Sequence, residues 1–106
     1  MDNQNGQKEI WIGFAKVKQL DRNGALGNAD QAYTNVIGLA KTKFGFRRQA
    51  KQAIEELGLQ LMRLEDAEPI RVRSLNYTIP KRTLALAEKA RKEKRIVFTV
   101  FASFDT

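Results

Sequence analysis

The chain has 106 residues, of which 42% are hydrophobic and 29% are charged, and its formal net charge is +7. A chain of this length builds one hydrophobic core and is too short for two. It contains no cysteine and no histidine, which excludes a disulfide framework and thiolate chemistry and removes the side chain best suited to proton transfer near neutral pH.

The first eight residues are polar, and we expect residues 1–8 to form a disordered lead and residues 9–106 to form a single domain. The lead lacks the apolar core of a signal peptide. No apolar run in the sequence approaches the roughly 20 residues that cross a bilayer. The sequence therefore predicts a cytoplasmic protein that does not enter a membrane.

Residues 9–20, "EIWIGFAKVKQL", are predicted to form the first strand. Apolar residues occupy both of its faces, with Ile10, Ile12 and Phe14 on one and Trp11, Ala15 and Val17 on the other. This pattern indicates a strand that is covered on two sides for part of its length. Residues 21–30 are rich in Asn, Asp and Gly and are expected to form a loop. Residues 31–41 follow as a second strand, paired with the first in a long-looped hairpin.

A helix is predicted from Thr42, which suits the N-cap position, to about Leu57. Gly58 is expected to end this helix, because glycine readily adopts the left-handed conformation there. The helix carries one apolar stripe, formed by Phe46, Ala50, Ala53, Ile54 and Leu57. We expect this stripe to pack against the sheet.

Residues 59–65 are predicted to form a third strand, and residues 66–79 an irregular segment with a short edge strand at 70–75. Pro80 suits the first turn of a second helix, over residues 80–93. The side chains of that helix expected to face the sheet are Leu84, Ala87 and Ala90.

Residues 95–104, "RIVFTVFASF", are predicted to form the last strand. One face of it would carry Ile96, Phe98, Val100, Ala102 and Phe104. The predicted order is β-β-α-β-α-β. It indicates an α+β fold with a four-stranded sheet, two helices on one face of that sheet and a split β-α-β unit.

Motifs for catalysis are absent from the sequence. The serines have no general base at a recognisable spacing, and no glycine motif suits a phosphate. The densest carboxylate group, Glu65, Asp66 and Glu68, lacks the central glycine and the spaced ligands of a calcium loop. We therefore expect no enzyme, no metal site and no cofactor, and we interpret this group as a solvated strand end or a patch that contacts a partner.

Charge is distributed unevenly along the chain. Residues 16–51 hold eight basic side chains against two acidic ones, residues 55–68 five acidic against one basic, and residues 71–95 nine basic against two acidic. This layout permits opposite potentials on different parts of the surface.

The basic residues suggest nucleic acid as one class of partner. The first helix places Arg47, Arg48 and Lys51 off its apolar stripe, and the second helix carries "KRTLALAEKARKEKR". The last strand resembles the aromatic strand of RNA-recognition domains only in part, since the glycines of that motif are missing. We interpret its phenylalanines as core residues, and a small basic RNA- or DNA-binding module remains the alternative function.

The chain as a whole resembles the small immunity proteins of bacterial contact-dependent growth inhibition and polymorphic-toxin systems. The resemblance is carried by the polar start that leads into "EIWIGFAKV", by "AYTNVIGLAK" followed by "FRRQAKQAIEELGL" and "EDAEPI", and by the aromatic C-terminal strand. It implies a cytoplasmic protein that neutralises a cognate toxin domain by forming a tight complex. These proteins share no catalytic motif, so no residue role follows from the resemblance.

The sequence itself suggests where such a partner would bind. Immunity proteins that face basic nuclease toxins are usually acidic, whereas this chain is basic, so contact would involve an acidic toxin or a local patch. The segment with Glu65, Asp66, Glu68, Arg71 and Arg73 is predicted to be a charged, irregular rim that pairs with charges of the toxin. Arg47, Arg48 and Lys51 form the second candidate patch. The oligomeric state does not follow from the sequence.

Overall fold

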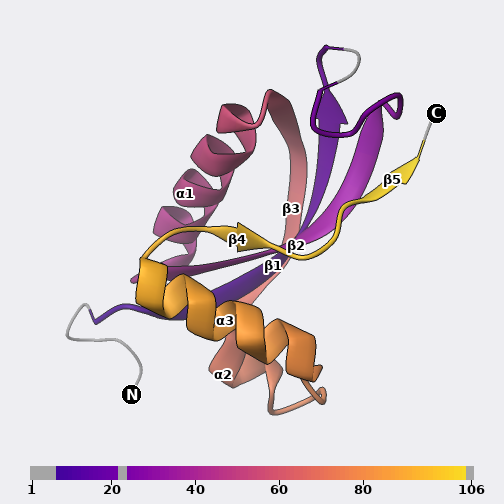
Figure 1. The fold of residues 1–106 in the computed structure, drawn as a ribbon. Coiled ribbons are helices and arrows are strands. Elements are labelled where there is room, and N and C mark those ends of the chain that lie inside the picture. The colour runs from indigo at the N-terminus through magenta and orange to yellow at the C-terminus, as the bar shows by residue number, and fades with distance from the viewer. Residues whose placement is uncertain (1–6, 22–23, 105–106) are drawn as a thin grey trace.

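One antiparallel sheet organises the molecule and carries helices on both of its faces (Figure 1). The computed structural model describes residues 7–21 and 24–104. In chain order its elements are β1 (Glu9–Gln19), β2 (Gln31–Ala40), α1 (Lys43–Glu56), β3 (Leu59–Pro69), α2 (Ile70–Arg73), α3 (Lys81–Glu93), β4 (Val97–Phe98) and β5 (Ala102–Phe104). The α+β class is confirmed, although the described residues form five strands and three helices where four and two were predicted.

The strands are ordered β3-β1-β2-β4, and β5 also pairs with β2. β1 and β2 form the predicted hairpin, in register from Glu9 opposite Ala40 to Lys18 opposite Gln31. Both β2 and β3 are antiparallel to β1, which lies between them, so they run in the same direction. Because α1 connects β2 to β3, the predicted split β-α-β unit is confirmed.

The helix α1 begins and ends as the sequence predicts. The side-chain hydroxyl of Thr42 accepts a hydrogen bond of 3.0 Å from the backbone N–H of Gly45. Gly58 has a φ of 79°, in the left-handed region that follows many helices. Ile54 is fully buried, as are Phe46 and Ala50. The expectation of a buried Leu57 is wrong, because this C-cap residue is 41% exposed.

One face of the sheet, which we call the α1 face, packs against α1 through the main core cluster. Two strand glycines make this close packing possible. A Cβ atom at Gly38 would collide with Cδ1 of Ile96, and one at Gly13 would lie 2.9 Å from Cδ1 of Leu64. These contacts leave no room for a larger residue unless the neighbouring side chains shift.

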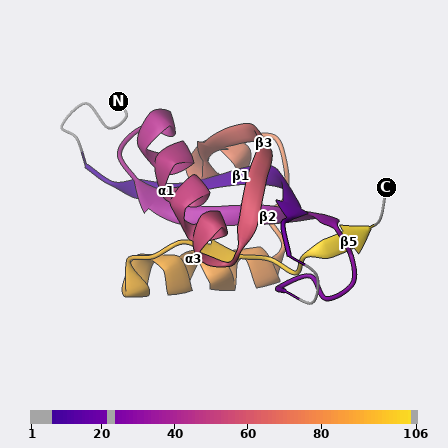
Figure 2. The same ribbon diagram turned by 90° about the horizontal axis from the view of Figure 1, so that it is seen from above.

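The helix α3 lies on the opposite face, which we call the α3 face. A second core cluster joins α3 to the sheet and is made of Ile10, Ile12, Ile37, Ala87, Ala90 and Val97. Figure 2 shows the sheet between α1 and α3. The prediction of both helices on one face is therefore wrong, because the apolar residues on the two sides of β1 each recruit a helix.

The surface of α3 that is buried also differs from the prediction. Ala87 and Ala90 face the sheet as expected, whereas Leu84 is 48% exposed. Thr83 is buried instead.

The end of β3 was predicted to be irregular, yet the strand continues to Pro69. Its pairing with β1 contains two register shifts. At one of them Asp66 and Ala67 lie opposite Gly13, and Asp66 has a φ of 54°. This bulge lets the strand continue past the predicted end. The short edge strand expected at 70–75 is wrong, because α2 occupies this segment.

The single C-terminal strand expected at 95–104 is interrupted between β4 and β5. The hydroxyl of Thr99 accepts a hydrogen bond of 2.9 Å from the backbone N–H of Asn35, and the N–H of Thr99 donates to the Asn35 carbonyl at 3.0 Å. At this point the Thr99 side chain, in place of a backbone carbonyl, accepts the hydrogen bond from the N–H of Asn35 in β2. As a consequence Phe98 packs with Phe101 beside the main cluster, whereas Phe104 lies on the α3 face, so the predicted single aromatic face is wrong.

The predicted disordered lead at 1–8 falls mostly outside the described residues and stays a prediction. Among residues 7–21 and 24–104, no helix has the length and apolar character needed to cross a bilayer.

Candidate functional site

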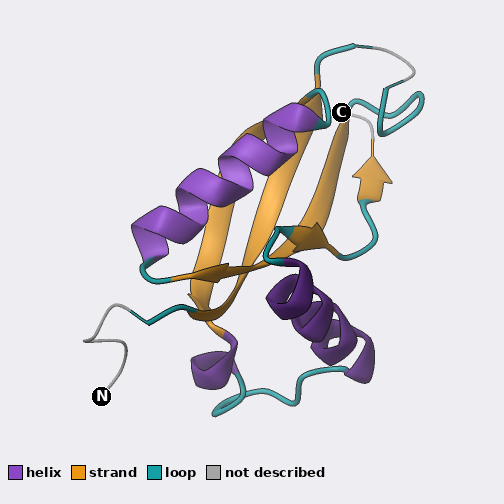
Figure 3. Cartoon of the chain, turned by 60° about the vertical axis from the view of Figure 1, so that its left-hand side comes forward, coloured by secondary structure: helices purple, strands orange, loops and turns teal. Residues whose placement is uncertain are grey.

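α3 covers only one end of its face of the sheet (Figure 1 and Figure 3). Its cluster reaches Ile12 on β1 and Ile37 on β2, and the strands extend well beyond these residues. The uncovered part, which we call the open half, carries the side chains of Phe14, Lys16, Lys18, Tyr33, Arg63 and Phe104.

Three aromatic rings form a stacked row on the open half, which we call the aromatic ladder. The centroids of Phe14 and Tyr33 lie 5.1 Å apart with an interplanar angle of 11°. Those of Tyr33 and Phe104 also lie 5.1 Å apart, at an angle of 19°. The two rings of each pair are diagonal neighbours on adjacent strands, and aromatic side chains are long enough to bridge this separation. The ladder therefore crosses β1, β2 and β5, and Phe14 remains 37% exposed.

Basic side chains flank the aromatic ladder. Lys16 and Arg63 are direct cross-strand partners, and Nζ of Lys16 lies 5.9 Å from the ring centroid of Phe104. Like charges placed opposite each other across two strands destabilise a sheet. No ion pair of Lys16, Lys18 or Arg63 is found within the part of the chain that the structure describes. The open half thus holds positive charge that a bound anion would neutralise.

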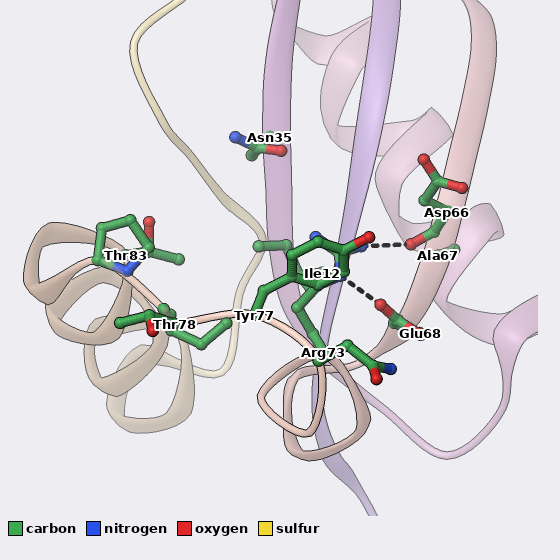
Figure 4. Close-up of a pocket in the computed structure, with 12 residues that line it drawn as sticks. Ile12, Asn35, Asp66, Ala67, Glu68, Arg73, Tyr77, Thr78 and Thr83 are labelled. Carbon is green, nitrogen blue, oxygen red and sulfur yellow. Dashed lines mark hydrogen bonds and ion pairs between the residues drawn. The ribbon is translucent and has the colours of Figure 1, made fainter.

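A cleft of about 610 Å³ adjoins the aromatic ladder on the same face of the sheet. Figure 4 shows Asp66, Ala67 and Glu68 on its β3 side and Thr78 and Thr83 on the side of α3. The cleft continues directly from the ladder, because Asn35 lines the cleft and is the cross-strand partner of Phe14.

The predicted charged rim is largely engaged in contacts within the chain. The guanidinium of Arg73 forms an ion pair with Glu68 and donates a hydrogen bond of 2.6 Å to the Asp66 carbonyl. Arg71 forms an ion pair with Glu9 at 3.1 Å. These contacts hold α2 against the end of β3 and the start of β1. Glu65 and Asp66 are exposed, so only part of the rim presents its charge to solvent.

The second predicted patch lies on the outer surface of α1, on the other side of the sheet. Arg47, Arg48 and Lys51 are all exposed. The guanidinium of Arg48 lies 5.0 Å from the ring centroid of Phe44, and Lys51 pairs with Glu55 at 2.8 Å. The structure therefore separates this patch from both the rim and the open half.

Sequence reasoning did not find the aromatic ladder. Phe14 and Tyr33 were expected in the first two strands, and Phe104 in the last, but nothing in the sequence sets the register that stacks them. The one available signal was the alternation of Phe14, Lys16 and Lys18 along a strand. Such alternation indicates a face on which rings and cations lie together.

Within the described residues, no group of three or more acidic side chains is placed to hold a metal ion. Comparison of the chain with models of known protein families, with curated proteins and with solved structures gave no match. The inference of function therefore depends on the geometry of this chain alone.

Proposed function

We propose that this chain is a non-enzymatic binding protein whose open half binds single-stranded nucleic acid. The observation that carries the proposal is the aromatic ladder of Phe14, Tyr33 and Phe104 with Lys16 and Arg63 beside it. Proteins that bind single strands combine a positive surface for the backbone with aromatic rings on which bases stack. Both parts are present here on one uncovered sheet face.

The charge of the open half also fits this partner. Three basic side chains, Lys16, Lys18 and Arg63, accompany one acidic neighbour, Glu65, which is the cross-strand partner of Phe14. Phosphates would relieve the repulsion between Lys16 and Arg63, since each is an anion that can lie between two cations. A duplex is a poorer fit, because its bases are already stacked and paired and cannot lie against protein rings.

Binding of labelled uridine and thymidine oligonucleotides of about 10 nucleotides, measured by fluorescence anisotropy at about 150 mM salt, tests the proposal. We expect a complex whose affinity falls as salt rises, with a slope near −2 for about three phosphate contacts. Replacing Lys16, Lys18 and Arg63 together by Gln should remove most of this slope.

The chain offers a charge-matched control. Replacing Arg47, Arg48 and Lys51 by Gln removes the same number of positive charges from the outer surface of α1. We expect this control to weaken binding only slightly, because a net charge of +7 gives some attraction to any polyanion. Equal losses in the two triple variants would contradict binding at the open half. The absence of any complex below about 10 μM at about 150 mM salt would contradict nucleic-acid binding altogether.

A second candidate function, the neutralisation of a toxin domain, is favoured by a different observation. β3 is the edge strand of the sheet, and Glu65 and Asp66 are exposed along it. An open strand edge can pair with a strand of a protein partner while its side chains provide specificity. This function and a cytoplasmic location stay predictions. The test is a one-to-one complex, measured by calorimetry, with the C-terminal domain encoded by the adjacent upstream reading frame.

A further inference from the structure

The cleft beside the aromatic ladder contains polar groups that the fold itself does not use. Thr83 is only 8% exposed and lines the cleft, yet its hydroxyl makes no hydrogen bond within the described residues. The side-chain amide of Asn35 also lines the cleft and has no hydrogen-bond partner there. Neither group is sealed inside the protein, so both are available to hydrogen-bond a polar group that enters the cleft.

The charges of the cleft select the chemistry of that ligand. Asp66 and Glu68 lie on the β3 side, and Arg73 is the basic residue of the lining. Since Arg73 is already paired with Glu68, the β3 side stays rich in acceptors. An ionised carboxylate offers about four acceptor positions, of which Arg73 uses one on Glu68. Carboxylates repel a phosphate, so the cleft suits a neutral group that carries hydrogen-bond donors.

The opposite side of the cleft provides hydroxyl and amide groups. Figure 4 shows Thr78 and Thr83 across from Glu68, with Tyr77 extending from the segment between α2 and α3 toward the strands. Hydroxyl and amide groups donate to carbonyl and ring-nitrogen acceptors. Tyr77 is 66% exposed and offers a ring against which a planar group can stack.

We propose that this cleft binds a guanine base of the strand that the aromatic ladder holds, an inference that rests on the proposed function. Guanine presents two neighbouring donors, N1–H and the 2-amino group, which match a carboxylate such as that of Glu68. Its O6 and N7 are acceptors and match the donors of Asn35 and Thr83. Because Asn35 faces Phe14 across the strands, one nucleotide can enter the cleft while its neighbours stack on the ladder.

The test compares three oligonucleotides on the wild-type protein: a uridine strand of about 10 nucleotides, the same strand with one guanosine, and the same strand with inosine at that place. Inosine lacks only the 2-amino group. We expect guanosine to raise affinity by about 5-fold or more over uridine, as a bidentate contact does, and inosine to lose most of this gain. Equal affinities for the guanosine and inosine strands would overturn the inference.

Two variants show whether the gain arises in this cleft. Thr83→Val removes the hydroxyl and keeps the shape of the side chain, and Asn35→Ala removes the amide. Each should reduce the advantage of guanosine and leave the affinity for the uridine strand unchanged. An unchanged guanosine advantage in both variants, with folding confirmed by circular dichroism, would place the preference outside the cleft and overturn the inference.

A measurement with the nucleoside separates the two proposals. Guanosine, but not uridine, should shift the backbone NMR signals of Thr78 and Thr83. If no strand binds but guanosine shifts these signals, the proposed function fails and the cleft remains a nucleoside site. If the uridine strand binds and guanosine has no effect in either assay, the proposed function stands and the guanine site is refuted.

Discussion

The two faces of the sheet differ in what covers them. On the α1 face, Phe46, Ala50 and Ile54 of α1 are fully buried against the strands. On the α3 face the helix stops short, and the remaining surface holds the aromatic ladder and its cations. The difference suggests a division of roles, in which one face stabilises the fold and half of the other remains available for contact.

The largest expected effect tests the role of the α1 face. Replacing Ile54 with Ala should lower the free energy of unfolding by about 2–4 kcal/mol, through lost burial and the cavity that remains. Urea denaturation measures it. Phe14→Ala, on the open half, serves as the comparison and should cost less, because Phe14 is already 37% exposed. A loss under about 0.5 kcal/mol for Ile54→Ala would mean that α1 does not pack as the structure has it.

The next effect concerns binding rather than stability. Tyr33→Leu removes the middle ring of the aromatic ladder but keeps an apolar side chain. We expect it to weaken binding of a single strand by about 5- to 100-fold, since base stacking on a ring contributes about 1–3 kcal/mol. Phe44→Leu is the matched control, because Phe44 is an exposed ring on α1, 67% accessible, and should change affinity little. Similar losses in both variants would contradict a site on the open half.

The apolar pattern of β1 and the ends of α1 show how much of the fold could be predicted from the sequence. Its sequence places Ile10 and Ile12 on one side and Trp11 on the other, and this pattern correctly indicated cover on both sides. The expectation of both helices on one face disregarded that signal. Local patterns also located α1, because the Thr42 cap and Gly58 act within one turn of the helix ends.

The remaining features depend on contacts between segments that are distant in sequence. The break between β4 and β5 depends on Thr99, which binds the backbone of Asn35. The continuation of β3 depends on a bulge opposite Gly13. The ladder needs the register of three strands, and the ion pair of Arg73 with Glu68 needs α2 to fold back on β3. None of these pairings is encoded in a local pattern.

A smaller effect should show that the open half is not optimised for stability. Arg63→Glu places an opposite charge across from Lys16. Because this replaces a repulsive cross-strand pair by an attractive one, the free energy of unfolding should rise by about 0.2–1 kcal/mol. The same variant should bind single-stranded nucleic acid more weakly than the wild type. Thermal denaturation and anisotropy measure the two changes, and a variant that is less stable than Arg63→Gln would contradict the repulsion inferred here.

Replacing the exposed acids of β3 should have the smallest effect on stability. Whether the replacement strengthens or weakens the binding of each partner separates the two candidate functions. Replacing Glu65 and Asp66 by Lys should change the free energy of unfolding by less than about 0.5 kcal/mol, because exposed charges contribute little. If the open half binds nucleic acid, this charge reversal should strengthen the binding of a uridine strand, since Glu65 is the cross-strand partner of Phe14 and its replacement adds a cation beside that ring. If the β3 edge instead contacts cations of a toxin domain, affinity for that domain should fall by about 10- to 1,000-fold.

Calorimetry with the toxin domain and anisotropy with an oligonucleotide, on the same variant, measure both affinities. Weaker nucleic-acid binding in this variant would contradict the site on the open half, and an unchanged toxin affinity would exclude the β3 edge as the protein interface.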